Sequence, residues 1–245
     1  MADNFDSKLA DINARIKTNP GDARLYFERA NVYADAKRVK EALRDYRRAT
    51  ELDPKNTEYI FSMASYNQQI GDLQEALSWY TKFLQFVPTS VAALNNRGLI
   101  NFELGSYDEA IKDCSAAIDA DSTFIYAYNN RGLAKLAKND YERALTDFEM
   151  AISMFPGYAE ALGNRGVAKF LLGNYTEALL DLKESIKLDS SNAAMFYYFK
   201  ALTLSALGND KDAYTDILKA LELSPSNEQY LRVKKEIETK TKQPA

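Results

Sequence analysis

The sequence predicts an all-α fold in which helix–turn–helix units stack into a solenoid. Three observations support this prediction. Turn segments recur at intervals of 34 residues, small side chains recur at fixed positions between them, and each interval divides into two helical stretches around a turn residue. Internal repeats with periods of about 20 to 50 residues are typical of solenoids, in which each unit buries its apolar face against its neighbours.

The turn segments set the boundaries of the units. Each follows an apolar helical stretch, and most contain a proline, which ends a helix because it lacks an N–H group. Their first residues are Pro20, Pro54, Pro88, Ser122, Pro156 and Ser190. The last unit closes at Pro225 after 35 residues, and we place its extra residue in a loop near Asn192. Residues 20–225 therefore hold six expected units, which start near Ala23, Thr57, Val91, Ile125, Ala159 and Ala194.

Small side chains mark where the two helices of a unit are expected to cross. The eighth position holds Ala30, Ala64, Gly98, Gly132, Gly166 and Ala201. The twentieth position is always alanine, at Ala42, Ala76, Ala110, Ala144, Ala178 and Ala213. The first helix is expected to end at a left-handed residue in the fifteenth position, which is Gly71, Gly105, Asn139, Gly173 or Gly208 in five units. Lys37 holds that position in the first unit, so we expect a different turn there.

Each end of the stack is expected to carry a capping helix, which shields an apolar face that an interior unit would pass to a neighbour. An apolar stripe with helical spacing predicts an N-terminal capping helix within residues 1–19, and its members are Phe5, Leu9, Ile12 and Ile16. A second amphipathic pattern predicts a C-terminal capping helix within residues 226–240, and it comprises Tyr230, Leu231, Lys234 and Ile237. We expect residues 241–245 to form a disordered tail.

Two positions of the unit change together. In five units a cation at the seventh position accompanies an aspartate at the twenty-third: Arg29 with Asp45, Arg97 with Asp113, Arg131 with Asp147, Arg165 with Asp181 and Lys200 with Asp216. The remaining unit has Met63 and Trp79 instead. This joint change predicts that the two positions touch, as five ion pairs and one sulfur–aromatic contact. The alternative, in which the arginines hold an anionic ligand, does not explain the joint change.

With this repeat the chain resembles the tetratricopeptide repeat proteins, over about residues 23–225. The resemblance implies a right-handed superhelical solenoid whose concave groove is lined by the first helix of each unit. It also implies a protein-binding function, with positions 2, 5, 6, 9, 12 and 13 of each unit facing the groove. The carboxylate clamp by which some members hold chaperone C-termini needs lysine and arginine side chains at certain groove positions. These side chains are missing when the clamp is aligned with units one to three and also when it is aligned with units two to four.

The implied groove carries asparagines in the middle units and apolar side chains from the third unit onward. An Asn amide both donates and accepts, so a ladder of asparagines suits an extended peptide backbone. Tyr126 and Phe199 are the expected anchors, because aromatic residues are enriched at interface hot spots. The alternatives are solvated asparagines and apolar residues that pack against the chain's own C-terminal helix. The expected partner-binding residues are Asn95, Asn96, Leu99, Phe102, Tyr126, Asn129, Asn130, Leu133, Leu136, Asn164, Val167, Phe170, Tyr198 and Phe199.

The composition argues against several classes of function. The chain has no His and one Cys, which removes the commonest general base, the usual zinc ligands and any disulfide framework. Its net charge of −4 argues against a nucleic-acid binder. No phosphate-binding loop or metal-ligand spacing is present, and Cys114 occupies a core position of its unit. We therefore expect no enzyme activity and no cofactor, and the sequence has no apolar stretch long enough for a membrane span.

Together these features predict a non-enzymatic scaffold that binds a peptide or a helix of a partner protein in its concave groove. The alternative is a self-assembling structural protein whose groove receives a terminal helix of a neighbouring copy. Residues 1–9 lack the basic start and the apolar run of a signal peptide, so we expect a cytoplasmic location. An exported location is the alternative if an export signal has been removed.

Overall fold

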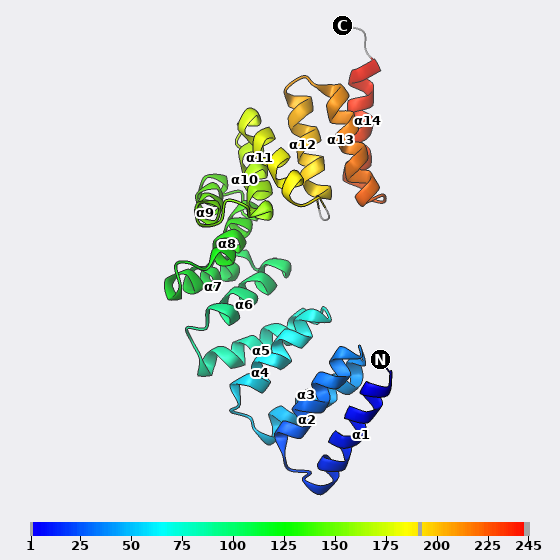
Figure 1. The fold of residues 1–245 in the computed structure, drawn as a ribbon. Coiled ribbons are helices and arrows are strands. Elements are labelled where there is room, and N and C mark those ends of the chain that lie inside the picture. The colour runs from blue at the N-terminus through cyan, green and yellow to red at the C-terminus, as the bar shows by residue number, and fades with distance from the viewer. Residues whose placement is uncertain (1, 191–192, 243–245) are drawn as a thin grey trace. The chain divides into compact units, whose positions relative to one another are not determined.

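The computed structural model describes residues 2–190 and 193–242, and these residues form fourteen α-helices (Figure 1). The chain divides into two compact halves, Met1–Asp121 and Ser122–Ala245. The N-terminal half contains α1 (Ala2–Thr18), α2 (Ala23–Asp35), α3 (Val39–Leu52), α4 (Thr57–Gln69), α5 (Leu73–Phe86), α6 (Val91–Glu103) and α7 (Tyr107–Ala120). The C-terminal half contains α8 (Ile125–Ala137), α9 (Tyr141–Met154), α10 (Ala159–Leu171), α11 (Tyr175–Leu188), α12 (Ala194–Ala206), α13 (Asp210–Leu223) and α14 (Glu228–Lys242). Within the described ranges, no helix combines the length and the apolar character needed to cross a lipid bilayer.

Consecutive helices pack in pairs within each half. In the N-terminal half α2 packs on α3, α4 on α5 and α6 on α7, and in the C-terminal half the pairs are α8 with α9, α10 with α11 and α12 with α13. The first helices of the six pairs begin at Ala23, Thr57, Val91, Ile125, Ala159 and Ala194, the residues from which the units are counted. The predicted all-α architecture of repeated helix–turn–helix units is therefore confirmed.

The turn inside each pair has the same conformation in all six units. Positive φ angles occur at Gly71, Gly105, Asn139, Gly173 and Gly208, and Lys37 shares this conformation with a φ of 56°. The N–H of Arg38 donates to the carbonyl of Tyr33 at 2.9 Å, as the N–H of Asp72 does to Asn67 in the next unit. The expectation of a different turn at Lys37 is therefore wrong. The same closing hydrogen bonds hold a lysine in a conformation that glycine adopts more readily.

The helices of a pair approach closely at the positions where small side chains recur. All six alanines at the twentieth position are fully buried. Gly132 shows why a small residue is needed at the eighth position: a Cβ atom there would lie 2.6 Å from Cε1 of the buried Phe148 ring. The missing side chain of α8 therefore makes room for a core ring of α9.

Helix α1 packs on α2 at the N-terminal end. Ile12 is buried, and the rings of Phe5 and Tyr33 lie 6.5 Å apart. The Oδ1 atom of Asn13 accepts a hydrogen bond from Nη1 of Arg29 at 2.7 Å. The apolar stripe of α1 therefore covers the first helix pair, while a polar contact at Asn13 fixes its register.

Helix α14 packs on α13 and α12 at the other end. Its buried residues are Tyr230, Val233 and Ile237, so Val233 occupies the place expected for Leu231, which is 41% exposed. The helix begins at Glu228 and ends at Lys242. The expected disorder is therefore wrong for residues 241–242, because neither Pro nor Gly stops the helix before that point. The rest of the expected tail, residues 243–245, lies outside the described residues.

Candidate partner-binding site

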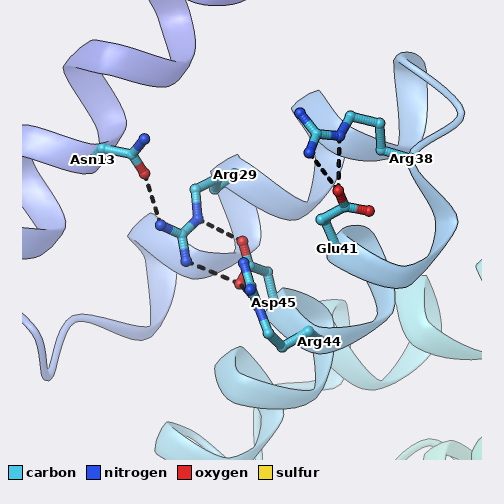
Figure 2. Close-up of polar contacts among 6 residues, drawn as sticks. All are labelled: Asn13, Arg29, Arg38, Glu41, Arg44 and Asp45. Atoms are coloured by element: carbon cyan, nitrogen blue, oxygen red, sulfur yellow. Dashed lines mark hydrogen bonds and ion pairs between the residues drawn. The ribbon is translucent and has the colours of Figure 1, made fainter.

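Ion pairs join the two helices of five units, as the sequence predicted. They are Arg29–Asp45, Arg97–Asp113, Arg131–Asp147, Arg165–Asp181 and Lys200–Asp216. Each arginine donates from Nε and Nη2 to both oxygens of its aspartate, and all five aspartates are buried. Figure 2 shows Arg29 held between Asp45 and Asn13. Hydrogen bonds with Asp45 and Asp181 raise the pKa of Arg29 and Arg165, so these guanidinium groups are bound within the scaffold.

In three units a second donor from the first helix reaches the buried aspartate. Lys135 Nζ lies 2.6 Å from Asp147, Lys169 Nζ lies 2.8 Å from Asp181, and Asn101 Nδ2 lies 3.0 Å from Asp113. Each of these residues follows its paired arginine by four positions, which is one helical turn. Sequence reasoning missed them, although a polar residue at the eleventh position of those units was the available signal.

The last unit lacks this second donor. The buried Leu204 stands at the eleventh position, so Lys200 is the cation that contacts Asp216 in this helix pair, at 2.9 Å. Burial raises the pKa of Asp216 above its ordinary value, and the hydrogen bond from Lys200 opposes this effect. The cost of burying the aspartate charge is therefore offset less fully in the last unit than in the others.

The unit without an ion pair replaces it with apolar packing. Met63 is 1% exposed, and Trp79 packs against the apolar cluster that contains Met63. The indole N–H of Trp79 donates to Glu75 at 3.2 Å, and Lys82 Nζ lies 4.8 Å from the ring centroid. The direct sulfur–aromatic contact stays a prediction.

The asparagines expected to form a ladder are mostly turned into the protein. Asn95, Asn129 and Asn164 are buried, which contradicts the expectation that they face an open groove. Asn164 Nδ2 donates to Asn129 Oδ1 at 3.0 Å, and Asn129 Nδ2 donates to Glu160 at 3.3 Å. These amides join α8 to α10, because buried polar groups must find partners within the protein. Asn130 is half-buried and also has an interaction within the structure.

Asn96 has a structural partner as well. Its Nδ2 atom donates to the hydroxyl of the fully buried Tyr80 at 2.9 Å. The Tyr80 hydroxyl in turn donates to Gln68 Oε1 at 3.0 Å and lies 3.0 Å from Ser65 Oγ. The amide therefore fixes a core tyrosine of the preceding unit, which leaves it less available to a partner.

The apolar members of the expected site divide into buried and half-buried residues. Val167 and Tyr198 are buried, contrary to expectation. The ring of Tyr198 stacks on Tyr230 of α14 at 4.8 Å, so the C-terminal helix covers this part of the expected face. Phe170 and Phe199 form an edge-to-face pair with centroids 5.6 Å apart. The half-buried members are Leu99, Phe102, Leu133, Leu136, Phe170 and Phe199.

Tyr126 is the most exposed of the expected residues, with 51% of its area accessible to solvent. Its ring lies 5.4 Å from Phe124 and 5.7 Å from Tyr158, and the Tyr158 ring lies 6.4 Å from Phe155, which is also 51% exposed. We call these four residues the Tyr126 cluster. Burial raises the pKa of Tyr158, and the nearby Glu160 and Tyr126 add to the effect.

Two members of the Tyr126 cluster replace helix-capping residues. The residue before the first helix is Asp22, Asn56 or Ser90 in the first three units, and each of these side chains accepts backbone N–H groups. Phe124 and Tyr158 hold the same position before α8 and α10 and make no such hydrogen bond. Loss of an N-cap costs about 1 kcal/mol. The sequence analysis did not single out Phe124 and Tyr158 because they lie in turns. The available signal was that they stand where the first three units have Asp, Asn or Ser.

The arrangement suits recognition of a protein segment. Exposed aromatic rings offer apolar contact, and Glu160 beside them offers a place for a cationic group. In the described part of the chain, no three His, Cys, Asp or Glu side chains gather in a way that could hold a metal ion. Cys114 is buried, as its core position predicted.

Comparison with known protein families finds tetratricopeptide repeats at residues 23–56, 91–124, 129–193 and 195–227. A search of curated protein sequences found no match.

Several solved structures have a similar fold. The crystal structure of the APC/C heterotetramer Cut9–Hcn1 has a TM-score of 0.76 at 18% identity, and the alignment covers 95% of this chain and 46% of that one. This chain therefore spans less than half the length of that relative. A tetratricopeptide repeat protein from Parabacteroides merdae has a TM-score of 0.73 at 20% identity, with 97% and 93% covered. The type IV pilus biogenesis factor PilW has a TM-score of 0.72 at 20% identity, with 86% and 97% covered.

The sequence matches extend over most of the chain, and they coincide with helix pairs joined by small residues and repeated ion pairs. The chain belongs to the tetratricopeptide repeat family.

Proposed function

We propose that the chain is a non-enzymatic scaffold that binds a segment of a partner protein at the Tyr126 cluster. Proteins of the tetratricopeptide repeat family typically act through protein–protein interaction. The proposal places the contact on the C-terminal half, where α8 and α10 begin.

One observation carries the proposal: two helix caps at this place are replaced by half-buried aromatic rings, which pack beside the exposed rings of Tyr126 and Phe155. The first three units show that the fold accepts an ordinary capping residue at the same position. Helix capping therefore does not explain Phe124 and Tyr158, and their contacts with Tyr126 and Phe155, which hold two rings at the surface, support a binding role.

The neighbouring residues indicate what the partner offers. Tyr126 and Asn130 are four residues apart on α8, and Leu133 follows three residues later, so the three share one face of the helix. The partner contributes apolar side chains to Tyr126, Phe155 and Leu133. Asn130, on the same face of α8, and the exposed Glu160 supply polar contacts to the partner. The buried Asn129 and Asn164 join α8 to α10 through a hydrogen bond.

The proposal is tested by placing a photo-crosslinking phenylalanine analogue at Tyr126 and identifying the captured proteins. A captured partner is then purified and titrated against the wild-type protein and the Tyr126→Ala variant. We expect Tyr126→Ala to weaken binding by about tenfold or more, as removal of an aromatic hot-spot residue typically costs at least about 2 kcal/mol.

Phe86→Ala provides the matched control, because Phe86 is 43% exposed but lies on α5 in the other half. Equal affinity of wild type and Tyr126→Ala for the captured partner would contradict the proposal. Capture of the chain by itself, together with a solution mass above 27.6 kDa that falls in Tyr126→Ala, would favour self-assembly instead.

A further inference from the structure

A surface hollow of about 560 Å³ lies between α2 and α3 in the N-terminal half. Its lining is strongly basic, with five cations and two carboxylates. The lining residues are Tyr26, Arg29, Lys40, Leu43, Arg44, Asp45, Arg47, Arg48 and Glu51. This local charge stands out because the whole chain carries a net charge of −4.

Four of these cations form a stripe along α3. Lys40, Arg44, Arg47 and Arg48 follow one another at spacings of four, three and one, which places them on one face of the helix. At about 1.5 Å per residue the stripe is about 12 Å long. All four residues are exposed, so their charges face solvent.

The scaffold leaves part of this charge uncompensated. Both oxygens of Asp45 are engaged by Arg29, and Arg44 Nε lies 3.3 Å from one of them (Figure 2). Arg48 pairs with Glu51 at 3.2 Å. Within residues 2–190 and 193–242, the side chains of Lys40 and Arg47 have no carboxylate partner.

The other units show that the fold does not need these cations. At the four matching positions of the second helix, none of the remaining five units has more than two cations. The unit of α9 has Glu142, Thr146, Glu149 and Met150 there. Because six copies share one scaffold, a charge stripe confined to α3 serves something other than folding.

The hollow also has an apolar part. The Tyr26 hydroxyl donates to the carbonyl of Pro20 at 3.1 Å, which fixes the ring. The guanidinium carbons of Arg29 and Arg48 lie 5.5 and 5.9 Å from the ring centroid. The half-buried Leu43 lies beside them in the lining. An occupant therefore meets an aromatic and aliphatic surface next to the cations.

We propose that this hollow binds an acidic segment of a partner protein. Two carboxylates of the segment pair with Lys40 and Arg47, which are two helical turns apart, and an apolar side chain packs on Tyr26 and Leu43. Charge complementarity selects the acidic segment. A nucleic acid fits less well, because the stripe is short and the rest of the chain is acidic. The proposal does not depend on the Tyr126 cluster, which lies in the other half.

The test uses the full chain and a fluorescent peptide of about 12 residues, with glutamates spaced one helical turn apart and leucines between them. A matched peptide carries glutamine in place of glutamate. We expect the glutamate peptide to bind at least about tenfold more tightly at low salt, and added salt to reduce the difference. Equal binding of the two peptides would overturn the proposal.

The double variant Lys40→Glu and Arg47→Glu tests whether the peptide binds in this hollow. We expect it to lower the affinity for the glutamate peptide about tenfold or more. Lys112→Glu with Lys183→Glu is the matched control, because these exposed lysines hold the second-helix positions of Arg44 and Arg47 in other units and give the same change of charge. An equal loss in both double variants would contradict a defined site. If the first double variant does not fold, the single Arg47→Gln variant replaces it, with a several-fold loss expected.

Two further measurements separate the proposals. Tyr126→Ala is expected to leave peptide binding unchanged, so the failure of one site does not imply the failure of the other. A short duplex DNA could instead bind more tightly than the glutamate peptide and lose this binding in the Lys40 and Arg47 double variant. That result would assign the hollow to a nucleic acid and overturn the proposal of an acidic protein segment.

Discussion

Arg131 and Asp147 join α8 to α9 through two hydrogen bonds, from Nε to Oδ2 at 3.0 Å and from Nη2 to Oδ1 at 2.7 Å. The two residues are sixteen positions apart, and Lys135 adds a third donor to the same carboxylate at 2.6 Å. Because the Asp147 side chain is buried, this contact is part of the scaffold and not a place for an external anion.

Replacement of Asp147 by alanine is therefore expected to destabilise the protein. The change leaves Arg131 and Lys135 partly buried without their carboxylate, at a cost on the order of 3 kcal/mol. Thermal unfolding followed by circular dichroism measures the effect. Glu149→Ala, at an exposed position of the same helix, is the control. An unchanged melting temperature in Asp147→Ala would show that the carboxylate contributes nothing to stability.

The exchange of an ion pair for Met63 and Trp79 predicts strong coupling between these two positions. Met63→Arg places a charge in a site that is 1% exposed, so it is expected to cost about 3 to 5 kcal/mol. Adding Trp79→Asp supplies the partner that the other five units have and is expected to recover part of that loss. A double-mutant cycle measures the coupling. Purely additive effects would mean that the two side chains do not interact.

The helix pairs and their ion pairs could be predicted because six copies of one unit can be compared within a single sequence. A position that is always alanine indicates a close crossing, and a joint change from Arg and Asp to Met and Trp indicates contact. The inference needs no structure, because equivalent residues share an environment.

The candidate site was harder to predict. The family resemblance implies that Asn129 and Asn164 face the groove, but it does not show that they bond to each other and to Glu160 across adjacent units. Phe155 and Tyr158 lie at a turn, whose path periodicity does not determine. Tyr198 is covered by α14, and this contact depends on how a helix outside the repeat packs.

Lys37→Gly is expected to stabilise the protein by about 1 kcal/mol. Lys37 has a φ of 56°, a conformation that costs a residue with a Cβ atom more than it costs glycine. The measurement is urea denaturation monitored by circular dichroism. Lys37→Ala keeps the Cβ atom and is expected to bring no gain. If the alanine and glycine variants are equally stable, the left-handed backbone is not the source of the strain.

Asp216 predicts a specific pH dependence of stability. Its pKa in the folded protein is raised, chiefly by burial, above the ordinary value of 3.8. A raised folded-state pKa contributes stability that is fully present below the unfolded pKa and is lost as pH rises through the folded pKa. Wild type should therefore gain stability relative to Asp216→Asn as the pH falls from about 7 to about 4.

The measurement is the free energy of unfolding of both proteins across that range of pH. The difference between them isolates Asp216 from the other carboxylates, which titrate in both proteins. A difference that moves the opposite way, with wild type losing relative stability on acidification, would mean that the ion pair with Lys200 outweighs burial.

Asn164→Ala is expected to lower stability by about 1 to 2 kcal/mol, because the change leaves the Oδ1 atom of Asn129 without its donor in a site that is 1% exposed. Asn174→Ala is the matched control, since Asn174 is exposed and its side chain makes no capping hydrogen bond. Chemical denaturation of both variants gives the comparison. Equal stability of the two would mean that the buried amide pair does not hold α8 to α10. A loss of stability in Asn164→Ala alone would mean that Asn129 and Asn164 stabilise the packing of α8 on α10 and do not themselves contact a partner.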